Sequence, residues 1–345
     1  MKINILYAIP LFTLFSCGSN EEKQAYQAEP ATKSTELTAL QEEAKSVFGR
    51  LPIQADNPEN PLNAKKVALG KKLYFETKLS KDNTISCNSC HNIDNGSGVD
   101  NLPFSPGNDG SLGGRNSPTT LNAALHMAQF WDGRAKDVEE QAGGPILNPV
   151  EMAMPSKEAV ITRLKNTNDF YPELFAQAFP YDENPMTYDN LQKAIGAFER
   201  TLITPSRVDD FIKGDHDALT GAEKRGLETF MAVGCTSCHA GNAFGGNMYQ
   251  KFGVYGDYWD YTKSDKMDEG RFEVTKNEAD KYVFKVPGLR NVAKTAPYFH
   301  DGSVKSLDEA VKIMAKAQLD RTLSDEETKN IVAFLNALSG DVKNY

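Results

Sequence analysis

Two short cysteine motifs constrain this chain more than any other feature of its sequence. Residues 87–91 and 235–239 both read C-x-x-C-H. Two thiols at this spacing can form thioethers to the two vinyl groups of one haem, and the imidazole that follows can bind the iron. The sequence therefore predicts two covalently bound haem c groups. The predicted thioether residues are Cys87, Cys90, Cys235 and Cys238, and the predicted iron ligands are His91 and His239.

Two other chemistries use paired cysteines. A redox-active pair needs no histidine after the second cysteine, and no β-α-β pattern surrounds either motif. A zinc site needs ligands arranged tetrahedrally, and a histidine directly after a cysteine is poorly placed for this. The motifs therefore favour haem attachment over redox and zinc chemistry.

The start of the chain is typical of an export signal. A mainly apolar run from residue 3 to residue 15 is too short to span a bilayer and suits a secretory signal peptide. It ends in Leu14-Phe15-Ser16-Cys17, which resembles a bacterial lipobox; a plain signal peptide with an unrelated cysteine is the alternative. We interpret 1–16 as a lipoprotein signal, Cys17 as the lipidated residue and 17–40 as a flexible tether. The protein is then exported to the periplasmic side and anchored to the membrane through its lipid.

Charge and length bear on partners and on domain number. A net charge of −9 gives no electrostatic reason to bind nucleic acid. A chain of 345 residues exceeds one comfortable hydrophobic core, so two domains are expected. The predicted boundary is Thr204-Pro205, between an N-terminal haem domain at 41–204 and a C-terminal haem domain at 205–345.

Similar segments in the two halves indicate a duplicated haem unit. The first half reads N-x7-F-W-D-G from Asn122, and the second half reads N-x7-F-H-D-G from Asn291. This register aligns Trp131 with His300. The two haem domains are therefore expected to share one framework.

The secondary structure is expected to be helical. Apolar residues recur at helical spacing in six segments, and long loops rich in glycine, proline and asparagine lie between them. Ser306 and Ser324, each followed three residues later by glutamate, are expected to form capping boxes. The expected fold is mainly α, with two cytochrome c-like haem domains and long haem-wrapping loops. The six predicted helices are 61–76, 157–166, 190–201, 222–231, 307–318 and 325–338.

The chain resembles the bacterial dihaem cytochrome c peroxidases over about residues 51–340. The resemblance rests on the two haem motifs and on further motifs that are specific in combination. These are Leu79-Ser80, Arg115-Asn116-x-Pro118-Thr119, Gln129-Phe130-Trp131-Asp132-Gly133-Arg134, Val150-Glu151-Met152, Val286-Pro287-x-Leu289-Arg290-Asn291 and Pro297-Tyr298-Phe299-His300-Asp301-Gly302.

The resemblance implies an enzyme that reduces hydrogen peroxide to water at its N-terminal haem. The C-terminal haem would receive electrons from a small donor protein of the cytochrome c or cupredoxin type. Met314 would be the sixth ligand of that haem. His300 is the rival ligand, but the resemblance makes it a pocket residue instead. The sequence around Met314 fits a core methionine equally well.

The resemblance also implies the catalytic residues. Glu151 matches the distal acid-base residue of the family, with Gln141 and Phe130 in the same pocket. Peroxide must lose a proton from one oxygen and regain one on the other, and a carboxylate in a mostly apolar pocket suits both steps. Trp131 would lie between the haems and assist electron transfer. A calcium ion at Asn116, Thr295 and Pro297 and a homodimer are implied in the same way.

The chain departs from the family in one loop. Many members carry a histidine that caps the peroxidatic iron until the other haem is reduced, and this chain has Asn108 at that position. Asparagine is a poor ligand for ferric haem, so we expect an open or water-bound N-terminal haem. Whether His126 caps the iron instead stays open. It is expected on a helix before Trp131, where a packed histidine is the favoured interpretation.

Two other functions fit the motifs. A related dihaem oxidant of a protein or organic donor has tyrosine on its electron-side haem where this chain has Met314. A pure dihaem electron carrier has two six-coordinate irons and needs no Glu151. Peroxide consumption that depends on a donor separates these functions from peroxide reduction.

Overall fold

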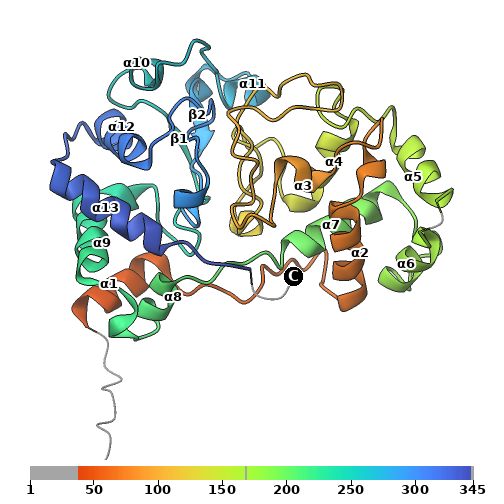
Figure 1. Cartoon of the computed structure of the whole chain (residues 1–345), viewed down its shortest axis with the longest axis horizontal. Coiled ribbons are helices and arrows are strands. Elements are labelled where there is room, and N and C mark those ends of the chain that lie inside the picture. The colour runs from red at the N-terminus through yellow and green to blue at the C-terminus, as the bar shows by residue number, and fades with distance from the viewer. Residues whose placement is uncertain (1–37, 168, 343–345) are drawn as a thin grey trace, which may run out of the picture. The chain divides into compact units, whose positions relative to one another are not determined.

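The structure is a computed structural model that describes residues 38–167 and 169–342 (Figure 1). The predicted signal peptide, Cys17 and most of the predicted tether lie outside these residues. Within the described ranges, no helix has both the length and the apolar character needed to cross a membrane. The described residues form one compact unit, so the predicted domain boundary at Thr204-Pro205 stays a prediction.

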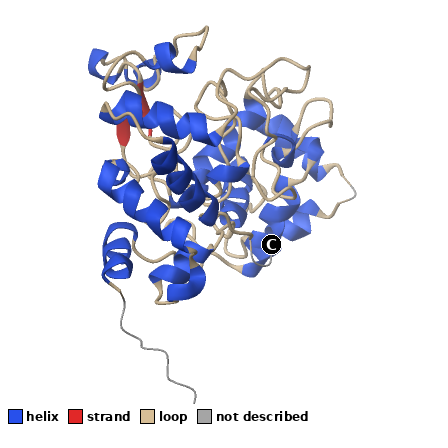
Figure 2. Ribbon diagram, turned by 60° about the vertical axis from the view of Figure 1, so that its left-hand side comes forward, coloured by secondary structure: helices blue, strands red, loops and turns tan. Residues whose placement is uncertain are grey.

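The described part of the chain is mainly helical, as predicted (Figure 2). Two short strands, β1 (Tyr249–Lys251) and β2 (Val283–Lys285), pair antiparallel. The α-helices are α1 (Ala39–Phe48), α2 (Ala64–Tyr74), α3 (Cys87–Cys90), α4 (Val138–Leu147), α5 (Lys157–Lys165), α6 (Tyr171–Ala178), α7 (Tyr188–Glu199), α8 (Arg207–Ile212), α9 (Gly221–Val233), α10 (Tyr258–Thr262), α11 (Phe272–Thr275), α12 (Leu307–Leu319) and α13 (Asp325–Ala337).

All six predicted helices are present, as α2, α5, α7, α9, α12 and α13. The capping box of α13 forms completely between Ser324 and Glu327. In α12, Ser306 accepts a hydrogen bond from the Glu309 N–H, but the described residues contain no return bond from the glutamate side chain, so this predicted box is only half made.

Four longer helices, α1, α4, α6 and α8, were not predicted from the sequence. Helix α4 contains Pro145 and two glycines, which weaken a helical pattern. Helix α6 follows Phe170, which has a left-handed backbone and gives no side-chain cap. These helices depend on tertiary packing more than on local signals.

A crossing of two helices occurs once in each half. Helix α2 crosses α7, and a Cβ atom on Gly70 would lie 1.8 Å from the carbonyl oxygen of Ala194. Helix α9 crosses α13, and a Cβ atom on Gly226 would lie 1.9 Å from the carbonyl oxygen of Asn330. Only glycine permits these approaches. The same close contact thus appears twice, as a duplicated unit requires. Figure 1 shows the two helix pairs, α2 with α7 and α9 with α13.

The two repeats meet at one buried threonine. Asn122 and Asn291 have the same left-handed backbone, with φ of 61° and 60°. The side-chain amide of Asn122 donates to Thr204 Oγ1 over 2.7 Å, and that hydroxyl donates to Asn291 Oδ1 over 3.2 Å. All three residues are buried. Thr204 therefore links equivalent positions of the two repeats.

Helix α1 packs in the C-terminal half, although the sequence grouped residues from 41 onward with the N-terminal domain. Phe48 stacks on Phe244 with ring centroids 4.3 Å apart. Gln41 donates from Nε2 to the carbonyl oxygen of Phe211 over 2.9 Å. The buried face of α1 thus completes the core formed by α8, α9 and α13.

Candidate active site

Each haem motif forms one helical turn in the wall of a cavity. Residues 87–90 form α3, and residues 235–237 form a 3₁₀ turn. The first motif lines a cavity in the N-terminal half, here called the N-terminal cavity, and the second lines the C-terminal cavity. None of the four cysteines of the two motifs forms a disulfide, so their sulfur atoms are available for attachment to a haem.

The histidines of both motifs are oriented by the backbone. His91 Nδ1 lies 3.0 Å from the carbonyl oxygen of Pro118, and His239 Nδ1 lies 3.1 Å from that of Phe244. Because a carbonyl only accepts, each ring donates from Nδ1 and keeps the lone pair on Nε2. This is the arrangement that an iron-binding histidine needs. The residues of both motifs therefore fit a covalently attached haem.

The turn after α4 brings Glu151 into the N-terminal cavity. Asn148 ends the helix, and its side-chain amide donates to Glu151 Oε1 over 3.0 Å. Gln141, from α4, and Phe130 line the same cavity. The structure thus brings together the three residues predicted for the distal pocket and the first haem motif.

Burial dominates the electrostatics of Glu151. It raises the pKa of the carboxyl above its usual value, against the opposing effects of Arg134 and the Asn148 amide. The guanidinium of Arg134 lies over the ring of Phe130, 3.4 Å from its centroid. Glu151 is therefore a carboxyl that can gain and lose a proton closer to neutral pH than an exposed glutamate.

The loop that contains Asn108 packs against the Glu151 turn. The Asn108 N–H donates to the carbonyl oxygen of Glu151 over 2.7 Å. Its side chain accepts from the Asp82 N–H over 3.0 Å and donates to Asp82 Oδ2 over 2.8 Å. Asn108 does not line the N-terminal cavity among the described residues, whereas Ser105 and Gly107 do.

Trp131 lines both cavities. Its indole Nε1 donates to the carbonyl oxygen of Asn116 over 2.8 Å. Its ring lies edge-on to His300, with centroids 6.2 Å apart. The residues aligned by the duplication, Trp131 and His300, thus stand side by side where the two cavities approach each other.

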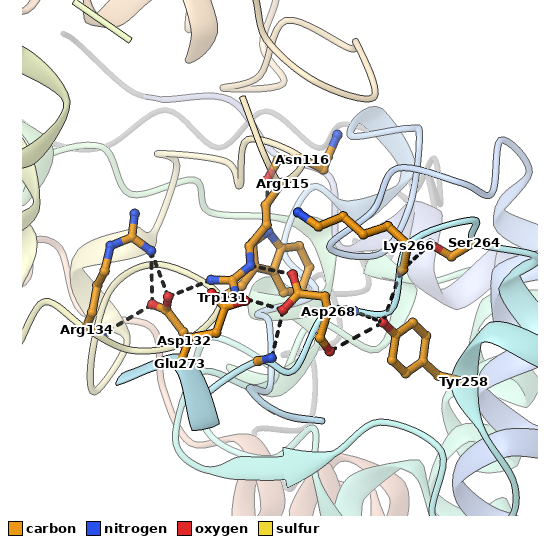
Figure 3. A network of polar contacts seen from close by, with 11 residues as sticks. Arg115, Asn116, Trp131, Asp132, Arg134, Tyr258, Ser264, Lys266, Asp268 and Glu273 are labelled. Atoms are coloured by element: carbon orange, nitrogen blue, oxygen red, sulfur yellow. Dashed lines mark hydrogen bonds and ion pairs between the residues drawn. The ribbon is translucent and has the colours of Figure 1, made fainter. Parts of the chain in front are cut away.

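A polar network connects this region to a loop of the C-terminal half (Figure 3). Arg115 donates from Nε and Nη2 to the two carboxylate oxygens of Asp268 over 2.6 and 2.8 Å, and its Nη1 contacts Asp132. Arg134 also binds Asp132, over 2.9 Å. Glu273 lies 3.0 Å from Arg115. Asp268 and Glu273 line the N-terminal cavity, so the C-terminal half contributes part of its wall.

The C-terminal cavity contains both candidates for the sixth iron ligand. Met314 extends from α12 into a lining that also includes His239. His300 lines the same cavity, is 2% exposed and leaves Nε2 without a hydrogen-bond partner in the described part of the chain. The predicted calcium residues, Asn116, Thr295 and Pro297, also line it.

His126 lies in the C-terminal cavity rather than the N-terminal one. The helix predicted before Trp131 is wrong, because only one 3₁₀ turn forms, from Ala123 to Leu125, and His126 follows it in an extended conformation. Among the described residues, His126 is absent from the lining of the N-terminal cavity. This position speaks against His126 as a cap on the N-terminal haem.

Comparisons with known proteins agree with this geometry. A family model described as di-haem cytochrome c peroxidase matches residues 64–217. The cytochrome c551 peroxidase of Pseudomonas aeruginosa is 45% identical over 312 residues, which cover 90% of this chain and 89% of that protein. The methylamine utilization protein MauG of Methylorubrum extorquens is 33% identical, with 85% and 83% covered.

A solved structure of a MauG-like protein associated with microbial copper homeostasis matches with a TM-score of 0.73 at 27% identity, covering 84% of this chain and 93% of that one. The chain belongs to the di-haem cytochrome c peroxidase family. It is accordingly a peroxidase with two c-type haems and a mainly α haem fold, which confirms the predicted family, fold class and type of enzyme.

Sequence reasoning missed two buried ionisable residues of this di-haem peroxidase. Glu199 lines the N-terminal cavity, and burial raises its pKa to about 8, with Glu139 adding to the effect. Glu199 lies five residues after Ala194, which Gly70 contacts in the first helix pair. The equivalent position in the second pair, five residues after Asn330, is Leu335. Aligning the helices of the two repeats would have revealed this asymmetry. Lys285, in the C-terminal cavity, had no local signal.

Proposed function

We propose that this chain reduces hydrogen peroxide to two waters in the N-terminal cavity, with two electrons and two protons. The position of Glu151 supports the proposal most directly. Its half-buried carboxyl lines the same cavity as Cys87, Cys90 and His91. A pure electron carrier has no use for a proton-transfer group at that place.

Each residue of the cavity has a chemical task in this proposal. A bound haem supplies an iron that binds peroxide and delivers electrons. Glu151 accepts the proton of one peroxide oxygen and returns it to the other, which then leaves as water. Gln141 donates a hydrogen bond toward the substrate, and the ring of Phe130 keeps the pocket poor in water.

Electrons are proposed to enter at the C-terminal cavity from a small cytochrome c or cupredoxin. A thioether ligand from Met314 raises the potential of a haem, which suits an entry site. Trp131 lines both cavities, and its indole ring is proposed to carry electrons between them.

Further proposals follow the family resemblance. Asn116, Thr295 and Pro297 would bind calcium through amide and backbone oxygens, which calcium prefers. Cys17 would carry a lipid that anchors the exported chain on the periplasmic side. The active form would be a homodimer.

The proposed activity predicts peroxide consumption that depends on a reduced donor. Purified protein with both haems should oxidise a reduced cytochrome c in stoichiometric proportion, two electrons for each peroxide. Peroxide reduction that needs no donor protein would favour the related dihaem oxidants instead. So would oxidation of an organic substrate without the ratio of two electrons for each peroxide.

The structure sharpens the prediction of an open N-terminal haem. Asn108 is bonded to Asp82 outside the cavity, so the loop offers no sixth ligand. The all-ferric protein should therefore show a high-spin signal in electron paramagnetic resonance and react with peroxide without prior reduction. Two low-spin haems and no reaction until one electron is added would contradict the prediction.

A further inference from the structure

The C-terminal cavity contains a buried cation that the proposed function does not use. Lys285, the last residue of β2, is 6% exposed and lines this cavity. Among the described lining residues, it is the sole lysine, arginine, aspartate or glutamate. Lysine is almost never so buried unless an anion accompanies it.

The part of the chain that the structure describes supplies no such anion. The nearest polar partner is His126, whose Nδ1 lies 3.2 Å from Lys285 Nζ. The ion pairs of residues 38–167 and 169–342 do not include Lys285. Burial alone lowers its pKa, to about 8, and burial together with Lys285 lowers the pKa of His126. His126 is thus a neutral acceptor, which orients the ammonium but does not balance its charge.

The position of His126 is fixed by two glycines of the C-terminal half. A Cβ atom on Gly246 would lie 2.2 Å from His126 Cδ2, and one on Gly288 would lie 2.6 Å from Nε2. The imidazole ring is therefore held between the two segments, and it fixes the ammonium of Lys285 in turn. The Lys285 N–H also donates to the carbonyl oxygen of Trp131 over 2.8 Å.

We propose that Lys285, oriented by His126, binds a propionate carboxylate of the C-terminal haem. The proposal rests on the motif at 235–239 attaching a haem in this cavity. A haem attached through its vinyl groups still carries two propionates, so the expected occupant brings the missing anion.

The proposed contact also affects electron transfer. A cation beside the propionate offsets negative charge near the iron, which favours the reduced state of that haem. The backbone of the same residue holds Trp131, so the anchor lies next to the proposed route between the haems.

Two substitutions separate charge from packing. Lys285→Met keeps a long apolar side chain and removes the cation, whereas Lys285→Arg keeps the cation. Lys251→Met is the matched control, because Lys251 lies in the paired strand β1, is exposed and does not line the cavity. The haem content of each full-length protein and the reduction potential of each haem are measured by spectroelectrochemistry.

In Lys285→Met, the ferrous-to-ferric ratio of the C-terminal haem at a fixed potential should fall about tenfold, which equals about 59 mV for one electron. Lys285→Arg and Lys251→Met should stay within about twofold of the wild type, and the N-terminal haem should not shift. Loss of the C-terminal haem from Lys285→Met, with retention in Lys285→Arg, would also support the anchor.

An unchanged potential in Lys285→Met with both haems present would overturn the proposal. So would equal shifts in the Met and Arg variants, since these would indicate packing rather than charge. A wild-type chain without a haem at 235–239 would instead remove the premise, whatever the variants do.

Discussion

Glu151→Gln should lower the rate of peroxide turnover by about 10² to 10⁴-fold, the usual contribution of a positioned acid-base group. The amide keeps the size of the side chain and can still contact Asn148, but it cannot accept the proton of peroxide. Haem content and both haem spectra should stay unchanged, which separates loss of chemistry from loss of structure. Steady-state turnover with a reduced cytochrome c measures the effect.

The pH profile provides a second measurement. Burial raises the pKa of Glu151 above 4.5, and the carboxylate is the form that accepts a proton. Activity of the wild type should therefore fall as the pH drops through that raised pKa, and Glu151→Gln should lack this limb. Glu183→Gln, at an exposed carboxylate outside both cavities, is the control. Turnover near that of the wild type in Glu151→Gln would place the acid-base group elsewhere.

Replacing Cys87 and Cys90 together by alanine should remove one covalent haem and all peroxide turnover. The two thiols lie on one turn of helix at the N-terminal cavity, and they are proposed to supply the thioether bonds to that haem. Mass spectrometry of the denatured, exported protein should show two haems on the wild type and one on the variant.

The same double substitution at Cys235 and Cys238 is the matched comparison. It should leave the haem at the first motif and abolish donor-dependent activity, because electrons would lose their proposed entry site. A variant of either pair that retains two covalent haems would show that the thioethers are formed by other residues.

The features that could be predicted from the sequence are those with a local pattern. Each haem motif fits within five residues, and the capping box of Ser324 within four, so spacing alone was sufficient. The duplication was visible because Asn122 and Asn291 repeat with their flanking residues, and the structure gives both the same backbone conformation.

The features that could not be predicted from the sequence depend on contacts between segments that are far apart in the chain. His126 and Lys285 are 159 positions apart and meet only after the repeats pack together. His126 was considered near the N-terminal haem because sequence distance was the only available guide. The structure places it beside Gly246 and Gly288 in the other cavity. Helix α4 was missed for a related reason. Pro145 interrupts its helical sequence pattern, and the helix is stabilised by packing against other segments.

Helix α1 sets the order in which the chain can be completed. Its Phe48 is made early during synthesis, whereas its ring partner Phe244 is made 196 residues later, and Phe334, which packs on Phe244, is made later still. The apolar face of α1 therefore stays uncovered while the ribosome synthesises the entire first repeat. A fragment beginning at Pro205 would lack this helix, and adding residues 38–49 as a separate peptide should restore its missing core contact.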